Sequence, residues 1–287
     1  MSGHHCLYYP RMNLNSLLAL LTANTALSWV LIVSILRIDI AVADQSAKRD
    51  LAKQLANPIA DLYTLPLQFN FDTRVGVDNK GSVYQLNAQP LIPFALNKDW
   101  NLISRTVLPL MLQTDVTGGN QQQFGIGDTL QSLFLSPSAP TEQGFTWGVG
   151  PALLMPTATD NSLGIKQWAM GATAVVLRQS GHLTIGILAN HLWSLGDGSR
   201  AYTATYTEPW ISYVFSSNTT LSMSVESNYD WNNDQLTLPV NIIVDQLFVI
   251  GEQAVSVGVG VKYWAASPAE GPKGFGARLQ VTFLWPK

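Results

Sequence analysis

Apolar and polar residues alternate with a period of two along most of the chain from Tyr63 onward. In the clearest segment, the residues on one face are Val255, Val257, Val259, Val261 and Tyr263, and those on the other are Ser256, Gly258, Gly260 and Lys262. Successive side chains of a β-strand point to opposite faces, so this pattern predicts strands with one apolar face. About 12 such segments follow one another, each near 10–14 residues. They lie near residues 63–76, 82–95, 100–113, 123–135, 144–155, 166–179, 182–195, 202–215, 219–229, 236–249, 253–264 and 274–285.

The connections between these segments alternate in length. Tight turns are expected at 97–99, 180–181, 216–218 and 251–252, and longer polar loops at 114–122, 156–165 and 265–273. Short turns on one rim and long loops on the other are typical of outer-membrane barrels. We therefore predict an all-β fold, an antiparallel transmembrane β-barrel of about 12 strands over residues 63–287. An even strand count places both ends of the barrel on the short-turn, periplasmic side.

The charge content changes the picture in the same direction. Only 12% of the 287 residues are charged, although the hydrophobic fraction is 47% and the mean hydropathy is +0.13. Soluble domains average about 25% charged residues. A barrel in lipid accounts for the deficit, because a Lys or Arg facing the bilayer midplane costs about 2–4 kcal/mol. The alternative is a secreted β-sandwich or lipocalin-like barrel, whose outer faces carry more charge than the Gly, Ser, Thr, Asn and Gln found here.

Two other classes of protein are disfavoured. A net charge of −3 without a basic cluster argues against a nucleic-acid partner. The apolar content argues against intrinsic disorder. Tryptophans near the ends of the predicted strands match the aromatic girdles of membrane barrels. They are Trp100, Trp147, Trp168, Trp193, Trp210, Trp231, Trp264 and Trp285.

The N-terminal segment carries the marks of a targeting signal. Arg11 precedes an apolar run over 17–36, and Ala41-Val42-Ala43 follows it. This order predicts a secretory signal peptide over residues 1–43, with Met12 as a candidate true start; an uncleaved anchor helix is the alternative. Cleavage after Ala43 also removes Cys6, the one cysteine. The mature chain then offers no disulfide scaffold, zinc–thiolate site or cysteine nucleophile.

Residues 44–62 form a separate periplasmic segment that either plugs the barrel or hangs beneath it. Leu51, Leu55, Ile59 and Leu62 recur at helical spacing, although Pro58 interrupts any continuous helix. We favour a short helix in a solvated tail, because the segment is short and carries charges suited to water. These charges are Lys48, Arg49, Asp50 and Lys53.

A series of short motifs gives the chain a family resemblance over about residues 50–287. They are 51–54 (LAKQ), 57–62 (NPIADL), 65–68 (LPLQ), 89–93 (QPLIP), 99–106 (DWNLISRT), 124–128 (FGIGD), 147–151 (WGVGP), 156–160 (PTATD) and 283–287 (FLWPK). In this order they resemble a bacterial outer-membrane family labelled "transporter" or meta-pathway phenol-degradation barrel, sometimes misnamed neuromedin U. The resemblance implies an outer-membrane β-barrel with a transport role and no established catalytic residues. The odd N-terminus departs from the family, as does the ending in Pro-Lys. Phe283 and Trp285 are then expected to supply the aromatic signal for the barrel-assembly machinery.

Polar residues on the inward face of the strands are the candidates for contact with a solute. By parity they are Gln68, Asn70, Asp72, Arg74, Gln85, Asn87, Gln89, Arg105, Glu226, Lys262, Arg278 and Gln280. They form either a selectivity lining or a hydrogen-bonded core that fills the barrel. The charged members are expected to be paired in both cases, because charges in a narrow lumen need partners.

Asp128 does not fit the simple parity. It alternates in phase with Phe124 and Ile126, which points its carboxyl group at lipid. A bulge near Gly125 and Gly127 would reverse the phase and turn it inward. The sequence leaves both readings open.

No motif indicates catalysis, so we predict no enzymatic activity, no catalytic residues, no metal and no cofactor. The mature chain has two histidines, His182 and His191, and lacks a G-x-S-x-G motif. His191 lies near Asn190 and Ser194, which keeps a lipid hydrolase on the outer wall as the weakest alternative.

The predicted function is an outer-membrane barrel that passes or binds a small solute. The family label suggests an aromatic or partly apolar compound. A non-conducting structural or binding barrel is the alternative. The predicted partners are outer-membrane lipid, the solute and the barrel-assembly machinery, with the oligomeric state left open.

Overall fold

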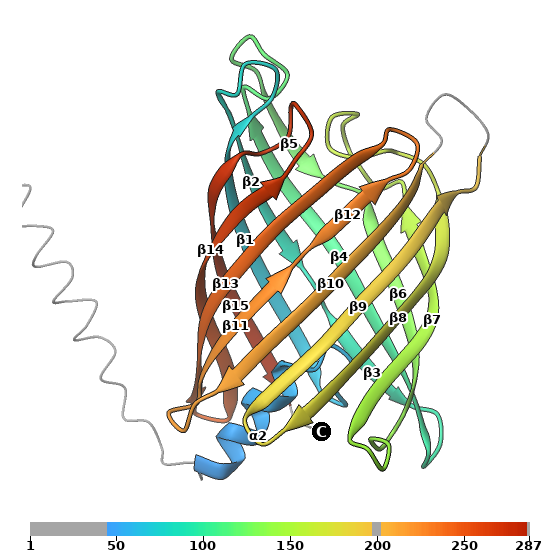
Figure 1. Ribbon diagram of the computed structural model, residues 1–287, viewed down its shortest axis with the longest axis vertical. Coiled ribbons are helices and arrows are strands. Elements are labelled where there is room, and N and C mark those ends of the chain that lie inside the picture. The colour runs from blue at the N-terminus through green and yellow to red at the C-terminus, as the bar shows by residue number, and fades with distance from the viewer. Residues whose placement is uncertain (1–44, 197–201, 286–287) are drawn as a thin grey trace, which may run out of the picture. The chain divides into compact units, whose positions relative to one another are not determined.

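The computed structural model describes residues 45–196 and 202–285 (Figure 1). The predicted signal peptide, 1–43, and the final Pro286-Lys287 lie outside the described residues, so their roles stay predictions. Within the described ranges, helix α2 (Gln45–Leu55) precedes fifteen strands. Of the helices described, none is long and apolar enough to cross a membrane.

The strands follow the predicted segments closely. They are β1 (Tyr63–Val75), β2 (Gly81–Ala88), β3 (Leu91–Ala95), β4 (Trp100–Thr114), β5 (Gln122–Ile126), β6 (Thr129–Pro137), β7 (Phe145–Met155), β8 (Ala169–Ser180), β9 (Leu183–Ser194), β10 (Thr203–Val214), β11 (Thr219–Val225), β12 (Ser227–Asp230), β13 (Gln235–Ile250), β14 (Gln253–Ala266) and β15 (Gly274–Trp285). Three predicted strands are each interrupted once, giving the pairs β2–β3, β5–β6 and β11–β12. The fifteen segments therefore form twelve spans, which confirms the predicted count.

The sheet closes on itself. Each span pairs antiparallel with the spans before and after it along the chain, and β15 pairs with β1. The seam between β1 and β15 holds nine residue pairs, from Tyr63↔Trp285 to Phe71↔Ala277. Closure removes both sheet edges and satisfies the backbone within the wall, as lipid requires.

The two rims differ as the turn pattern predicts. One rim carries tight turns, such as Gly181-His182 and Gly251-Glu252, and we call it the short-turn rim. Gly181 and Gly251 have φ of 57° and 62°, a backbone conformation that glycine adopts without steric cost. The opposite, long-loop rim carries the connections 115–121, 156–168 and 267–273. In Figure 1 the short-turn rim is at the bottom, next to α2.

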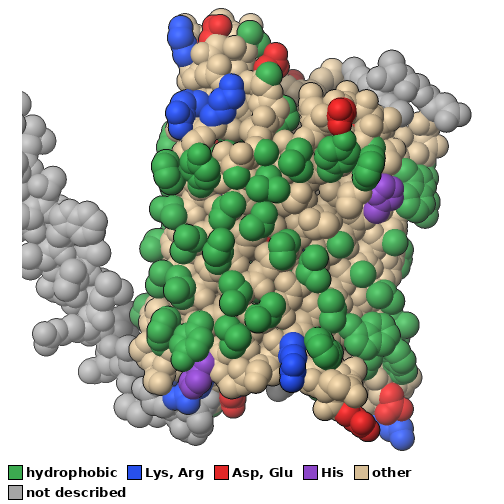
Figure 2. All heavy atoms as spheres, in the orientation of Figure 1, with side chains coloured by type: hydrophobic (Ala, Val, Ile, Leu, Met, Phe, Trp, Pro, Cys, Tyr) green, Lys and Arg blue, Asp and Glu red, His purple; other side chains and the backbone are tan. Residues whose placement is uncertain are grey.

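The outer face of the wall is apolar and exposed. Along β8, exposed Met170, Ala172, Ala174 and Val176 alternate with buried inward-facing residues, and Val259 on β14 has an exposed fraction of 61%. On the face drawn in Figure 2, apolar side chains cover the band between the rims, and charged side chains lie toward the two ends. Soluble monomers rarely expose apolar patches beyond a few hundred Å². A belt that continues across neighbouring strands therefore indicates contact with lipid.

The aromatic girdle is only partly as predicted. Trp100 and Trp147 lie on the outer face, with ring centroids 6.0 Å apart in an edge-to-face arrangement. Trp210 and Trp264 instead point into the lumen, where their indole N–H groups donate to Ala56 O and to Asp72 Oδ1. Closeness to a strand end did not separate the two groups, because facing depends on parity along β10 and β14.

Candidate functional site

Residues 45–62 enter the short-turn end of the lumen. Ala52, Ile59 and Leu62 are buried, with exposed fractions of 3%, 4% and 1%. Ala52 and Leu62 pack against inward-facing side chains near the short-turn ends of four strands, namely Val214, Leu247, Ala254 and Leu284. The expected solvated tail is therefore wrong. The apolar positions of the segment match apolar positions at the barrel mouth, which the segment alone could not reveal. We call residues 45–62 the plug.

Ile59 is the plug residue that joins the main apolar cluster of the lumen. That cluster consists of Leu91, Ile103, Phe134, Val175, Leu177 and Leu188. A Cβ atom at Gly148 would lie 3.3 Å from Ile59 Cδ1, so the glycine leaves room for this side chain. Ile59 thus lies among side chains from five strands, β3, β4, β6, β8 and β9.

Hydrogen bonds fix the path of the plug. Gln179 Nε2 donates to Lys53 O at 2.8 Å, and Trp210 Nε1 donates to Ala56 O at 3.2 Å. Asn57 Oδ1 accepts the backbone N–H of Ile59 at 3.0 Å, just after the end of α2. This local bond replaces a helical one beside Pro58, so the chain turns upward into β1.

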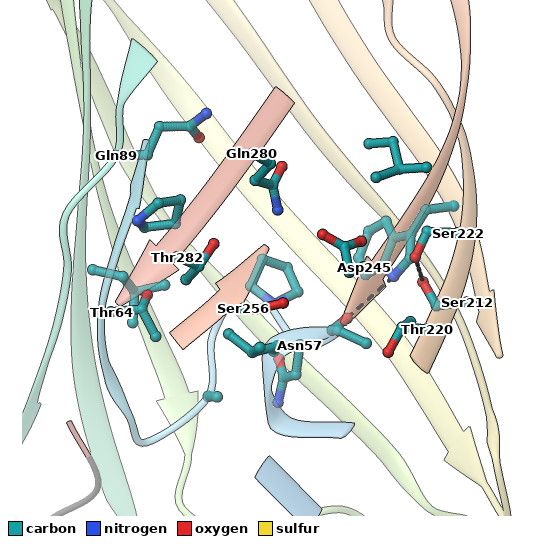
Figure 3. A pocket seen from close by; sticks show the side chains of 18 of the residues that line it. Asn57, Thr64, Gln89, Ser212, Thr220, Ser222, Asp245, Ser256, Gln280 and Thr282 are labelled. Carbon is teal, nitrogen blue, oxygen red and sulfur yellow. Dashed lines mark hydrogen bonds between the residues drawn. The ribbon is translucent and has the colours of Figure 1, made fainter. Parts of the chain in front are cut away.

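A cavity of about 250 Å³ lies between the plug and the barrel wall (Figure 3). Its lining mixes polar and apolar groups from both sources. The plug contributes Leu55, Ala56, Asn57 and Pro58, and the wall contributes Gln68, Gln89, Arg105, Leu188, Glu208, Trp210, Asp245, Arg278 and Gln280, among others.

Arg278 on β15 forms the first buried ion pair of the lumen. Its Nη1 lies 2.7 Å from Glu226 Oε1 and its Nη2 lies 3.2 Å from Oε2, a two-pronged arrangement. Arg278 Nε also donates to Asn70 Oδ1 at 2.7 Å. Glu226 occupies the interruption between β11 and β12. The pair crosses the barrel interior and satisfies most of the guanidinium.

Lys262 on β14 forms the second pair. Its Nζ lies 3.1 Å from Asp72 Oδ2, and Trp264 Nε1 donates to Asp72 Oδ1 at 2.7 Å. Gly276 lies on β15, between β14 and β1, and a Cβ there would lie 2.4 Å from Asp72 Oδ1. A glycine on the lumen face thus leaves space for a charged neighbour.

An amide network covers the wall at β1, β2 and β4. Gln68 Oε1 accepts from Asn87 Nδ2 at 3.3 Å and from Gln89 Nε2 at 3.4 Å. Gln85 Nε2 donates to Asn87 Oδ1 at 2.7 Å, and Arg105 Nη2 donates to Gln89 Oε1 at 2.7 Å. Arg105 is thus bonded to a neutral amide, and among the described residues it has no carboxylate within ion-pair distance.

The structure places eleven of the twelve predicted candidates in the lumen wall. Their contact with a solute stays a prediction. Arg74 is the exception, and its placement by parity is wrong. The pairing of β1 with β2 shifts register between Thr73 and Val75, and Arg74 has φ of 57°. The side chain is exposed, and its Nε donates to Lys273 O at 3.1 Å at the long-loop rim.

Two acidic residues of the cavity were missed by the sequence reading. Glu208 accepts a hydrogen bond from Tyr206 Oη at 2.9 Å, and it is in phase with lumen-facing Trp210. Parity along β10 could have found it, although large aromatic neighbours suggest the opposite face. Asp245 lies within the apolar stretch of β13, where the alternation is hidden because both faces are largely apolar.

The side chain of Asp128 turns inward because the alternation along the strand reverses just before it. Gly125 pairs with Met111, whereas Leu130 pairs with Val107, so the register slips by one residue between β5 and β6. Asp128 Oδ1 accepts the N–H of Ala158 at 3.1 Å, and Oδ2 accepts the N–H of Lys166 at 2.9 Å. The carboxylate therefore holds a loop rather than facing lipid, and the motif at 124–128 meets the motif at 156–160.

The loop 156–168 folds against the inside of the wall at the long-loop end. A Cβ at Gly125 would lie 1.9 Å from Thr159 Oγ1 and 3.1 Å from Leu163 Cδ1. Gln113 Nε2 also reaches Ser162 O, at 3.4 Å. Hydrogen bonds from Ser162 Oγ and N hold the pKa of Asp160, on the exposed side of this loop, below its ordinary value of 3.8. The lumen is thus narrowed by chain segments at both ends.

The residues of the hydrolase alternative do not come together. His191 faces outward, and its Nδ1 lies 2.8 Å from Thr205 Oγ1. Ser194 has the opposite parity, and its Oγ accepts from Tyr202 N. In the described part of the chain, no three metal-ligating side chains cluster closely enough to hold an ion. The predictions of no catalysis and no metal stay predictions.

A closed twelve-span barrel with an apolar belt and a polar lumen defines the class of this chain, a β-barrel of the outer-membrane type. The fold is similar to that of an outer-membrane channel from Pseudomonas putida F1, with a TM-score of 0.60. The similarity covers 78% of this chain and 96% of the channel, at 14% identity.

Other barrels of the class are less similar. The NanC porin gives a TM-score of 0.46 at 9% identity, covering 77% of this chain and 98% of its own. The outer-membrane phospholipase of Salmonella typhi gives a TM-score of 0.43 at 12% identity, covering 85% of this chain and 99% of its own. No family model and no curated protein sequence matches the chain. The likeness to the Pseudomonas channel supports the barrel class, and the particular phenol-degradation family stays an expectation.

Proposed function

We propose that this chain resides in the bacterial outer membrane and passes a small solute through its lumen. The short-turn rim then faces the periplasm, and the plug closes that end. The observation that carries the proposal is the cavity of about 250 Å³ between the plug and a wall that offers both polar and apolar groups. A barrel that served only as a structural wall would have no need of a lined space behind a segment packed into its lumen.

The size and lining of the cavity suggest the kind of solute. Sites for drug-sized ligands occupy about 300–1,000 Å³, so this one suits something smaller. Leu55, Leu188 and Trp210 offer an apolar surface, and Gln68 and Arg105 offer polar contacts. This combination fits a small, partly apolar compound, with the family resemblance adding aromatic compounds as a class to test.

The plug is the part that has to move or yield. It is held by apolar packing at Ile59 and Leu62 and by hydrogen bonds from Gln179 and Trp210. These bonds end on plug carbonyl oxygens, and most net hydrogen bonds contribute only about 0.5–1.5 kcal/mol. The free-energy cost of displacing the plug therefore lies mainly in the packing of Ile59 and Leu62, and the two hydrogen bonds add less.

Planar-bilayer conductance of the purified mature chain tests the proposal. We expect discrete open-channel steps, with small organic solutes changing their size or duration. Silence across solutes, together with unchanged uptake in a deletion strain, would favour the non-conducting barrel. Fractionation tests the location, since recovery of folded protein from the soluble periplasm would refute a membrane barrel.

A further inference from the structure

The cavity above the plug is unevenly charged. Four ionisable side chains line it, namely Arg105, Glu208, Asp245 and Arg278. Arg278 is neutralised by Glu226. Arg105 and Glu208 are bonded to neutral partners, and Asp245 has no ion-pair partner in the described part of the chain. With the Arg278 pair set aside, one cation faces two carboxylates, so the cavity favours a positively charged occupant.

Asp245 is the ionisable residue of the cavity for which the described residues supply the fewest hydrogen-bond partners. Its Oδ1 is buried and accepts no hydrogen bond from the described residues. On the lumen face its cross-strand neighbours are Thr220 on β11 and Gly258 on β14. A Cβ at Gly258 would lie 2.0 Å from Asp245 Oδ1, so the carboxylate lies directly over this glycine.

Several hydroxyl groups line the same cavity as this carboxylate. Ser212, Ser222 and Thr220 lie on the same side of the cavity as Asp245, while Thr64 and Gln89 lie on the opposite side (Figure 3). Ser212 Oγ and Ser222 Oγ are 2.9 Å apart. Ser256 and Thr282 add two further hydroxyls to the lining. Each hydroxyl can accept as well as donate, so the surroundings offer several acceptors to a donor-rich cation.

We propose that the part of the cavity lined by Asp245, Thr220 and Ser222, which we call the Asp245 lobe, binds the ammonium group of a small organic amine, with Asp245 as the counter-ion. The inference rests on the proposed function, because it names the solute class for the same lumen. A primary ammonium carries three donors and no acceptor, which matches one carboxylate with hydroxyl acceptors on the same side of the cavity. The apolar part of such a solute would lie toward Leu188 and Trp210, on the neighbouring strands β9 and β10.

Binding of two matched probes to the full mature chain in detergent tests the proposal. The probes are n-butylammonium and n-butyrate, which have similar chains and opposite charges, measured by calorimetric titration at equal ionic strength. We expect n-butylammonium to bind and n-butyrate to bind at least about tenfold more weakly. The Asp245→Asn variant should lose at least about tenfold in n-butylammonium affinity, and Asp78→Asn on an exposed loop should lose none. Gly258→Ala places a methyl group where the carboxylate lies, so it should weaken binding while keeping the charge.

Several results would overturn the assignment. They are equal binding of both probes, binding of neither, or an affinity that neither Asp245→Asn nor Gly258→Ala lowers. Equal competition by sodium ions would assign the lobe to an inorganic cation instead. Because binding is measured without flux, binding in a barrel that shows no conductance would refute the channel and keep the amine site. Conductance without any preference for n-butylammonium would refute the amine site and keep the channel.

Discussion

The packing of Ile59 should control how often the plug leaves its seat. The Ile59→Ala substitution removes a side chain that is 4% exposed and packs within the main apolar cluster of the lumen. Large-to-small substitutions of buried isoleucine cost about 2–5 kcal/mol. The cost falls on the seated plug, because a displaced plug exposes this position to water in both proteins.

The lower end of that range already has a large effect. Since 1.4 kcal/mol is a factor of ten, about 2 kcal/mol raises the ratio of displaced to seated plug about 30-fold. The barrel itself should stay folded, because its wall is held by strand pairing around the full circle.

Limited proteolysis with trypsin measures this ratio. Arg49 and Lys53 lie on α2, and when opening is fast compared with cleavage the cleavage rate follows the population of the open form. We expect cleavage at these sites to rise about 30-fold or more in Ile59→Ala, with more frequent conductance steps in bilayers. The matched control is Ile185→Ala, which removes the same atoms from a lipid-facing position that is 51% exposed. Equal cleavage rates for the two variants would refute the reasoning that the plug is held by packing.

Four further outcomes follow from the described contacts. Trp210→Phe removes the indole donor to Ala56 O and should raise tryptic cleavage of α2 only about fivefold, since a net hydrogen bond is worth about 1 kcal/mol. Asp128→Asn leaves one acceptor oxygen for two backbone N–H groups, and hydrogen exchange at the Lys166 amide should speed up by an amount equivalent to about 1–3 kcal/mol. Gly150→Ala places a Cβ 1.8 Å from Leu133 O and should lower the yield of heat-modifiable folded barrel on gels, whereas Gly196→Ala meets no atom within 4 Å and should not. The pKa of Asp160 is lowered in the folded loop, so its contribution to loop stability is present above about pH 4 and is lost as the pH falls through the lowered value. Protection of loop 156–168 from proteases should decrease in that pH range. Unchanged protection would contradict the bond to Ser162.

The sequence predicts the wall well because one physical rule governs it. A strand between lipid and a polar lumen must alternate, and the segments near 253–264 and 274–285 match β14 and β15 almost to the residue. The same rule places Gln68, Lys262 and Arg278 on the inner face. It fails where the backbone departs from regular pleating. Arg74 follows a register shift, and the slip between β5 and β6 turns Asp128 inward.

The plug and Asp245 needed information that no local pattern contains. The charges of α2 indicate solvent, and only the apolar ends of β10, β13, β14 and β15 show what Ala52 and Leu62 contact. Asp245 is surrounded in sequence by Ile243, Val244 and Leu247, so its role depends on Thr220 and Gly258 from other strands. Contacts between distant strands define the cavity, and such contacts are visible only after the barrel has closed.

The seam of the barrel has a consequence for the order of assembly. The plug directly precedes β1, and its partners Ala254 and Leu284 belong to β14 and β15, at the other end of the chain. Contacts of such long sequence separation form late, because the chain entropy of closing a long loop opposes them. The last strand therefore docks on β1 and on the plug together, and the plug acts as an internal brace across the joint. Seating the plug and closing the barrel are therefore coupled during assembly, and a substitution that loosens the plug should slow the insertion of newly made chains as well as free the plug in finished barrels.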